Sequence, residues 1–223
     1  MSRDMVEDEG EHNAWPAFVD LLAATSLLFV TLVGVFIYLG SARTRGIETT
    51  RQYLFVKLSA ASEQGRLYSL DTTDRQFVRI ILKEQATFPR NEYQWKTLRA
   101  EGKAALTRIA GVLNDTTLST RYREVRVLGY TDQDPYPSAA LSNWELSAAR
   151  AAVVARYLVD GVSVDPCKIT ATGRGPYFPI AGKPKEASRR IEIQIVPELK
   201  SGGRGDGCDP RGDGSRSRFQ EVP

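Results

Sequence analysis

The hydrophobic pattern divides the chain into one long apolar run and a mixed region behind it. Between residues 17 and 39 the only charged residue is Asp20. A helix over this run would extend about 35 Å, which is enough to cross the hydrocarbon core of a bilayer. We therefore expect a transmembrane helix over residues 15–40, preceded by a short segment 1–14.

The region 74–197 carries the patterns of a small mixed domain. Short runs rich in branched residues predict four strands, at 77–82, 125–129, 169–173 and 191–195. In the last of these, isoleucines alternate with polar residues, which predicts a half-buried strand. Apolar residues at helical spacing predict one helix from about residue 98 to Asn114 and a second between Asn143, its N-cap, and Gly161, its terminator. The expected fold is α+β, a compact β-α-β-α-β-β sandwich.

Two flanking segments lack such patterns. Residues 41–73 mix arginine, lysine and glutamate with scattered leucines, and we expect a stalk or linker with some helix. The final segment, 198–223, is rich in glycine, arginine, aspartate and serine and nearly devoid of apolar residues, which predicts a disordered tail.

Asp20 is the most informative residue of the apolar run. An ionised carboxylate at this depth costs several kcal/mol unless it is paired, protonated or hydrated, so a simple anchor would avoid it. We expect Asp20 to carry an ion, with H⁺ preferred and Na⁺ the second choice. The alternative is that Asp20 lies among the lipid headgroups and caps the helix.

A helical projection places a stripe of mostly small or polar residues on the Asp20 face. The stripe consists of Ala24, Leu27, Thr31, Gly34 and Tyr38. Small residues allow close approach of another helix, and hydroxyls can hydrogen-bond across the contact. This pattern favours a partner protein on the Asp20 face, and the alternative is a plain anchor with scattered threonines.

The composition excludes several classes of function. The net charge of the 223-residue chain is +3 and its basic residues form no single block, so nothing suggests nucleic-acid binding. The lone histidine, His12, lies in the acidic N-terminal segment, which argues against a histidine metal site or a catalytic triad. Because no hydrolytic arrangement is recognisable either, we expect neither an enzyme nor a cofactor. Cys167 and Cys208 could form a disulfide or be two unrelated thiols.

Charges flanking the span give conflicting signals about topology. Residues 1–14 contain one arginine against five carboxylates, a net charge of −4, which is unlike a cleavable signal peptide. Behind the span, Arg43, Arg45 and Arg51 favour a cytoplasmic location for the C-terminal side by the positive-inside rule.

Four motifs in the mixed region resemble the OmpA-like peptidoglycan-binding domain. They are Gly129-Tyr130-Thr131-Asp132, Asn143-x-x-Leu146-Ser147-x-x-Arg150-Ala151, Gly173-Arg174-Gly175-x-x-x-Pro179 and Ser188-Arg189-Arg190-Ile191-Glu192-Ile193. The resemblance covers residues 74–197 and is specific, because the motifs lie far apart and all match. Two departures exist, since Tyr130 stands where histidine is common and Ser188 where asparagine is common.

The resemblance implies a ligand and its binding residues. It implies that Asp132 and Arg150 hold the diaminopimelate side chain of the wall stem peptide, whose end carries an ammonium and a carboxylate. A carboxylate suits the first group and a guanidinium suits the second. By resemblance, Thr131, Asn143, Leu146 and Arg190 line the same site. The alternative is that Asp132 and Arg150 form only an internal salt bridge.

A wall-binding domain would resolve the conflict over topology. Its ligand lies outside the inner membrane, so the resemblance implies a single-pass inner-membrane protein with a cytoplasmic N-terminus and a periplasmic C-terminal domain. A large domain can translocate despite a modest charge bias. The periplasm would also favour a disulfide between Cys167 and Cys208, within or between chains.

The two halves together resemble a motor B subunit. The run Trp15-Pro16-Ala17-Phe18-Val19-Asp20-Leu21-Leu22 is similar to the stretch around the ion-carrying aspartate of the MotB, ExbD and TolR superfamily. ExbD and TolR lack such a periplasmic domain, and MotB proteins have a basic N-terminus. The chain therefore resembles most the ZorB group, the B subunits of the Zorya anti-phage defence system.

That resemblance implies partners and an energy source. It implies a homodimer of this chain inside a ring of five ZorA-like (MotA-like) membrane subunits, peptidoglycan as the anchor, and proton flow through Asp20 as the drive. The alternatives are a flagellar MotB-type stator subunit and a simple wall-tethering membrane protein.

Overall fold

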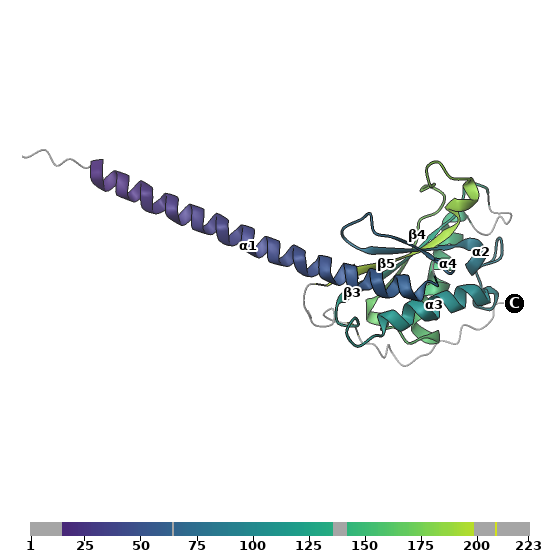
Figure 1. The fold of residues 1–223 in the computed structure, drawn as a ribbon. Coiled ribbons are helices and arrows are strands. Elements are labelled where there is room, and N and C mark those ends of the chain that lie inside the picture. Colours follow the sequence, from purple (N-terminus) through teal and green to yellow (C-terminus); the bar gives the residue numbers. More distant parts are fainter. Residues whose placement is uncertain (1–14, 64, 136–141, 199–207, 209–223) are drawn as a thin grey trace, which may run out of the picture. The chain divides into compact units, whose positions relative to one another are not determined.

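A computed structural model of the chain describes residues 15–63, 65–135, 142–198 and 208 (Figure 1). The chain divides into two compact units, one up to Arg45 and one from Gly46 onward. Helix α1, Trp15–Ala61, contributes residues to both units. The expected tail lies outside the described residues, apart from Glu198 and Cys208.

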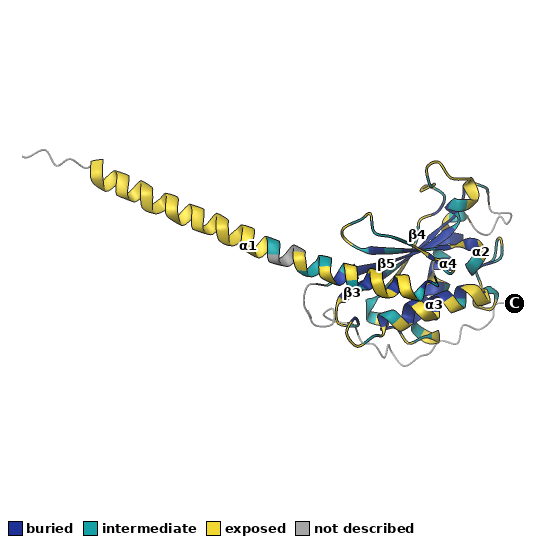
Figure 2. Cartoon of the chain, viewed as in Figure 1, coloured by how far each residue is buried: buried dark blue, intermediate teal, exposed yellow. Residues whose placement is uncertain are grey.

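The first described unit is the apolar part of α1. Residues 15–40 are all exposed (Figure 2), although most of them are hydrophobic. Within the described ranges, α1 is the one helix long and apolar enough to cross a membrane, and it contains the expected span 15–40. An apolar surface of this kind requires lipid or partner helices around it.

Two threonine hydroxyls of this unit bond to the helix itself. Thr25 Oγ1 donates to the carbonyl of Leu22 at 3.0 Å, and Thr31 Oγ1 donates to that of Leu27 at 2.8 Å. On the Asp20 face, Thr31 therefore already has an acceptor for its proton. A partner helix would meet a surface shaped by small side chains more than by free hydroxyl donors.

The second unit is built on an open five-stranded sheet of order β1-β2-β5-β3-β4. The strands are β1 Ser69–Asp71, β2 Val78–Lys83, β3 Tyr122–Tyr130, β4 Ile169–Gly173 and β5 Arg190–Pro197. Strands β3 and β4 are parallel, and the other neighbours are antiparallel. The four expected strands are all present, and β1 is an additional edge strand.

The helices of this unit are connected closely to the strands. They are α2 Glu84–Thr87, α3 Ala100–Leu113 and α4 Asn143–Arg156, with a π turn over Tyr157–Gly161 and 3₁₀ turns at Trp95–Thr97, Pro166–Lys168 and Lys185–Ser188. The α3 and α4 side chains Leu106, Ile109 and Val154 share one core with Ile80, Val127 and Ile193 of the sheet. The expected mixed fold is confirmed, with an open sheet covered by helices on its apolar face.

The N-cap of α4 is one residue earlier than expected. Ser142 accepts a hydrogen bond from the backbone N–H of Glu145, and the Glu145 carboxylate accepts one from the backbone N–H of Ser142. This reciprocal capping box satisfies two otherwise orphan donors. The assignment of Asn143 as the N-cap is therefore wrong, and its amide is available for other contacts.

Strand β5 is buried along its whole length, whereas a half-buried strand was expected. It lies between β2 and β3, so its isoleucines face the core while its polar residues face other side chains. Glu192 is buried because Arg190 Nε lies 2.7 Å from one carboxylate oxygen and Arg79 Nε lies 3.5 Å from the other. Because its charge is paired in this way, a carboxylate of β5 can be buried together with the apolar residues of the strand.

Within the segment 41–73, the residues from Gly46 onward are not a free linker. In the second part of α1, Leu54 and Leu58 are fully buried in the domain core. Tyr68 donates its hydroxyl proton to the carbonyl of Leu58 at 2.7 Å. Arg51 donates to the carbonyls of Thr72 and Asp74 at 3.1 and 3.2 Å. This part of the chain therefore contributes to the fold of the second unit.

Leu58→Ala should destabilise the second unit by about 2–5 kcal/mol, because it removes a fully buried side chain and leaves a cavity. Val56→Ala, two residues away on the exposed side of α1, should change the free energy of unfolding by no more than about 0.5 kcal/mol. Denaturant unfolding of the full-length protein in detergent, followed by tryptophan fluorescence, measures both. Equal small effects would mean that this part of α1 does not stabilise the domain.

In the structure, Cys167 and Cys208 of one chain form a disulfide. Their Cα atoms are 5.8 Å apart, and the bond closes a sequence separation of 41 residues. Cys167 lies in the 3₁₀ turn before β4, so the bond ties Cys208 to the edge of the sheet.

Cys208→Ser should lower the stability of the periplasmically expressed protein by about 3–4 kcal/mol, because it removes a constraint on the unfolded chain. Wild-type protein treated with a reductant should show the same loss, and Cys208→Ser should not respond to reductant. Non-reducing electrophoresis should show a monomer band. A dimer band that persists in Cys167→Ser and disappears in Cys208→Ser would instead reveal an interchain bond.

Candidate functional site

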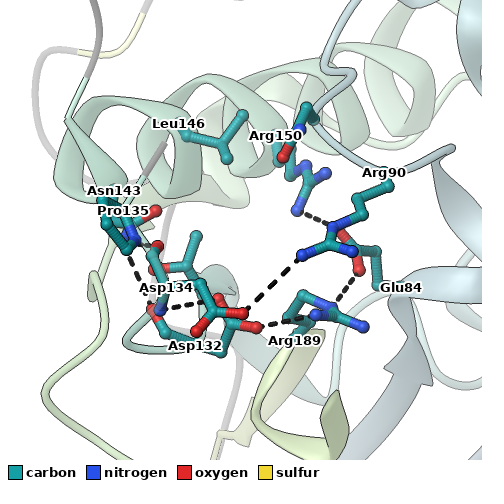
Figure 3. Close-up of a pocket in the computed structure, with 11 residues that line it drawn as sticks. Glu84, Arg90, Asp132, Asp134, Pro135, Asn143, Leu146, Arg150 and Arg189 are labelled. Atoms are coloured by element: carbon teal, nitrogen blue, oxygen red, sulfur yellow. Dashed lines mark hydrogen bonds and ion pairs between the residues drawn. The ribbon is translucent and has the colours of Figure 1, made fainter. Parts of the chain in front are cut away.

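One pocket of the second unit gathers charged residues from four segments of the chain (Figure 3). The end of β3 contributes Thr131 and Asp132, and the first turns of α4 contribute Asn143, Leu146 and Arg150. The remaining lining residues are Glu84, Arg90, Asn91, Asp134, Pro135 and Arg189. The pocket forms where β3 ends and α4 begins, next to the segments that follow β2 and precede β5.

The floor of the pocket is a buried chain of alternating charges. Arg150 Nη1 lies 2.5 Å from one oxygen of Glu84, and Arg189 Nε lies 2.6 Å from the other. Arg189 Nη1 in turn lies 2.7 Å from an oxygen of Asp132. All four side chains are buried or nearly so, which strengthens these interactions compared with a surface pair. Asp132 and Arg150 are therefore linked through Glu84 and Arg189, and not paired with each other.

Arg150 is held by further contacts. Its Nε donates to the carbonyl of Glu92 at 2.8 Å, and its Nη2 donates to that of Pro89 at 3.3 Å. Its guanidinium also lies over the Phe88 ring, 5.7 Å from the centroid. A guanidinium positioned this firmly loses little freedom when an anion binds.

Burial alone would lower the pKa of Arg189, but the hydrogen bond to Asp132 and the charges of Glu84 and Asp132 raise it overall. Its positive charge is therefore secure at every physiological pH. The pocket thus keeps a permanent cation at its centre, between two carboxylates.

The rim of the pocket is more exposed and carries Asp134. Lys185 Nζ donates to its carboxylate at 2.9 Å, and Arg90 Nη2 lies 3.6 Å away. The hydrogen bond from Lys185 is the main cause that lowers the pKa of Asp134, and the charges of Lys185, Arg90 and Arg189 add to it. Asn143 Nδ2 donates to the backbone carbonyl of Asp134 at 2.7 Å and so fixes the loop against α4.

Thr131 places a buried hydroxyl in the lining of the pocket. Its backbone N–H donates to the carbonyl of Gly175 at 3.1 Å, but Oγ1 has no hydrogen-bond partner among the described residues. A buried hydroxyl of this kind usually meets water or a ligand. The cavity volume is about 40 Å³, which is suited to the end of a side chain and too small for a large ligand.

Comparisons with known proteins agree on the domain type. Residues 87–192 match the OmpA family. The chain is 25% identical over 207 residues to the Zorya protein ZorB of Escherichia coli O139:H28, with 84% of this chain and 82% of ZorB covered. The chain is therefore similar to ZorB along most of its length and to OmpA-family domains over residues 87–192.

Solved structures support the same fold. A putative MotB-like protein from Desulfovibrio vulgaris has a TM-score of 0.59 at 19% identity, covering 70% of this chain and 99% of that one. The cell wall anchor of the type VI secretion system from Pseudomonas aeruginosa has a TM-score of 0.52 at 25% identity, covering 63% and 95%. The periplasmic domain of Helicobacter pylori MotB has a TM-score of 0.51 at 22% identity, covering 61% and 83%.

The structure brings most of the expected site residues together. Five of the six line the pocket, namely Thr131, Asp132, Asn143, Leu146 and Arg150. Arg190 does not, because its Nε pairs with Glu192 and its guanidinium lies 3.8 Å from the centroid of the Tyr130 ring. Its neighbour Arg189 lines the pocket instead. Successive side chains of an extended backbone point in opposite directions, so a shift of one residue exchanges them.

The sequence did not reveal the other charged residues of the pocket, which are Glu84, Arg90, Asp134 and Arg189. A partial signal existed for Glu84, a carboxylate directly after a strand of apolar residues, and for Arg189, next to the expected Arg190. The residues expected to act in the membrane, Asp20 and the stripe from Ala24 to Tyr38, lie on the exposed apolar part of α1. They belong to the other compact unit.

Proposed function

We propose that this chain is the peptidoglycan-anchored B subunit of an ion-driven rotary motor of the bacterial inner membrane that acts in anti-phage defence. The observation that carries the proposal is the similarity to ZorB, which extends over 84% of this chain. Coverage of that extent cannot be confined to the region that matches the OmpA family, residues 87–192.

The pocket supports the anchoring role. It holds three arginines and three carboxylates, so it is suited to a zwitterion more than to a simple anion or cation. The free end of diaminopimelate is such a group. Its ammonium would bind near Asp132 and its carboxylate near Arg150. The Thr131 hydroxyl, which has no hydrogen-bond partner among the residues that the structure describes, would complete the set. The small cavity matches this terminal group and leaves the rest of the stem peptide outside.

The apolar part of α1 supports the motor role. One elementary charge that crosses a potential of 100 mV releases about 2.3 kcal/mol. This energy becomes motion only if Asp20 alternates between its charged and neutral forms in two environments. Within the described part of the apolar run, Asp20 is the one ionisable carboxylate, so a partner subunit must supply the hydrated path. Protons are the preferred ion and Na⁺ is the second choice.

The assembly follows from the same proposal. Two copies of this chain would lie within five ZorA-like subunits, with the N-terminus in the cytoplasm and the OmpA-like domain in the periplasm. The disulfide between Cys167 and Cys208 fits an oxidising compartment. Held by the wall, the dimer would be the fixed frame against which the ring moves.

A flagellar MotB-type stator subunit is the second candidate. It is favoured by the structural similarity to MotB-like domains from Desulfovibrio vulgaris and Helicobacter pylori. A simple wall-tethering protein is the third, and it would leave Asp20 without a role.

Phage plating and motility separate these candidates. Cells that carry this chain with its partner membrane subunit should resist phages, and deletion of this chain should restore full plaque formation. Restored swimming in cells that lack their flagellar stator B subunit would support the second candidate. Neither effect, together with retention of the protein on purified sacculi, would leave only the tether.

A further inference from the structure

Two exposed aromatic side chains lie together next to the pocket. Trp144 is 50% exposed and Tyr177 is 72% exposed, and their ring centroids are 5.7 Å apart. They come from the start of α4 and from the loop between β4 and β5. Exposed apolar side chains that lie together mark interaction sites, and aromatic residues are enriched among the contacts that contribute most to binding. We refer to them as the aromatic pair.

The backbone at Gly175 packs closely against the aromatic pair. Gly175 has a φ of +61°, and a Cβ added there would lie 2.7 Å from Cε3 of Trp144. Any other residue would displace the Trp144 ring. The backbone N–H of Gly175 donates to Ser147 Oγ at 3.0 Å, which ties the loop to α4. Pro176 stands between Gly175 and Tyr177 and restricts the loop further. The rings are therefore positioned before a ligand arrives, which lowers the entropic cost of binding.

The aromatic pair is continuous with the wall of the pocket. Gly175, against which Trp144 packs, accepts the backbone hydrogen bond of Thr131, and Thr131 lines the pocket. In α4, Trp144 directly follows Asn143, which also lines the pocket. A molecule that places a side chain in the pocket would therefore bring its adjoining parts to the aromatic pair.

We propose that the aromatic pair binds a sugar ring of the glycan strand while the pocket holds the stem peptide. The proposal rests on the proposed function of the pocket and adds a second class of ligand to it. The C–H face of a pyranose is apolar and flat enough to stack on an aromatic ring, and its hydroxyls stay in water at the ring edge. An exposed tryptophan beside a tyrosine offers such an apolar surface with a polar tip. The aromatic pair is uncharged and suits the apolar face of a sugar. The pocket is charged and suits the zwitterionic end of the stem peptide.

Binding measurements with two ligands test this proposal. Full-length protein in detergent is titrated with a soluble diaminopimelate-containing stem peptide without sugar, and separately incubated with purified sacculi. Trp144→Ala should weaken retention on sacculi by about tenfold and leave the affinity for the stem peptide unchanged. Trp144→Phe should restore most of the retention, because it keeps an aromatic face. Peptide-free glycan strands should compete with sacculi for the wild-type protein and so lower its retention. They should not lower the remaining retention of Trp144→Ala.

Controls separate this proposal from the function of the pocket. Trp95→Ala removes a tryptophan that is 36% exposed and lies outside the pocket lining, and it should not change retention on sacculi. Thermal melting confirms that each variant is folded. Unchanged retention of Trp144→Ala, or an equal loss for sacculi and stem peptide, would overturn the assignment of the aromatic pair to sugar. Failure of the wild-type protein to bind the stem peptide at all would instead contradict the proposed function.

Discussion

Asp20→Asn should abolish phage protection completely while the protein still inserts and assembles with its partner subunit. Asparagine has nearly the shape of aspartate but cannot release a proton, so the charge cycle stops. The exposed apolar helix around position 20 keeps its surface, so insertion should be unchanged. Efficiency of plating measures function, and co-purification with the partner subunit measures assembly.

Two further variants sharpen this test. Asp20→Glu keeps an ionisable carboxylate and should retain part of the activity. Thr25→Val changes a residue off the Asp20 face whose hydroxyl bonds only within the helix in the structure, and it should retain full activity. Full protection by the asparagine variant would rule out ion transfer through this residue.

Asp132→Asn should weaken binding of the diaminopimelate stem peptide by about 2–3 kcal/mol, roughly 30- to 150-fold, because a hydrogen bond to a charged ligand group is lost. Asparagine retains an acceptor for Arg189, so the buried contact at 2.7 Å is weakened and not removed. Isothermal titration of the full-length protein measures the change. Asp160→Asn is a matched control, since Asp160 forms an exposed pair with Arg156 after α4 and does not line the pocket.

Arg150 requires a different substitution. Arg150→Ala would leave Glu84 with one buried partner instead of two and should destabilise the domain by about 3–5 kcal/mol, which would obscure any effect on binding. Arg150→Lys keeps the positive charge but loses the fork geometry, so it should weaken stem-peptide binding with a smaller loss of stability. Unchanged stem-peptide affinity in both Asp132→Asn and Arg150→Lys, at normal melting temperature, would remove this pocket as the ligand site.

The charge network changes the meaning of the two motif residues. Asp132 and Arg150 are implied by resemblance as direct ligand contacts, and the structure adds that each is also part of the buried chain through Glu84 and Arg189. Binding and folding are therefore linked at this site. Variants that conserve size and polarity are needed to separate the two.

The sequence by itself determined the features that depend on local pattern. The long apolar run that contains Asp20 specified a helix long and apolar enough to cross a membrane, because the length and polarity of a helix are properties of neighbouring residues. Strands β2, β3, β4 and β5 followed from short runs rich in branched residues, and helices α3 and α4 followed from apolar residues at helical spacing. Five of the six expected pocket residues were found because they lie in motifs at the ends of those elements.

The tertiary structure decided the features that depend on contacts between distant segments. Only the fold places Glu84 between Arg150 and Arg189, residues 66 and 105 positions further along the chain. Leu54 and Leu58 resemble stalk residues in sequence and become core residues only when α1 packs against the domain. Whether Arg189 or Arg190 faces the pocket depends on the phase of β5, which the pairing with β2 and β3 sets. A local pattern defines which elements form, but their packing defines which charges meet.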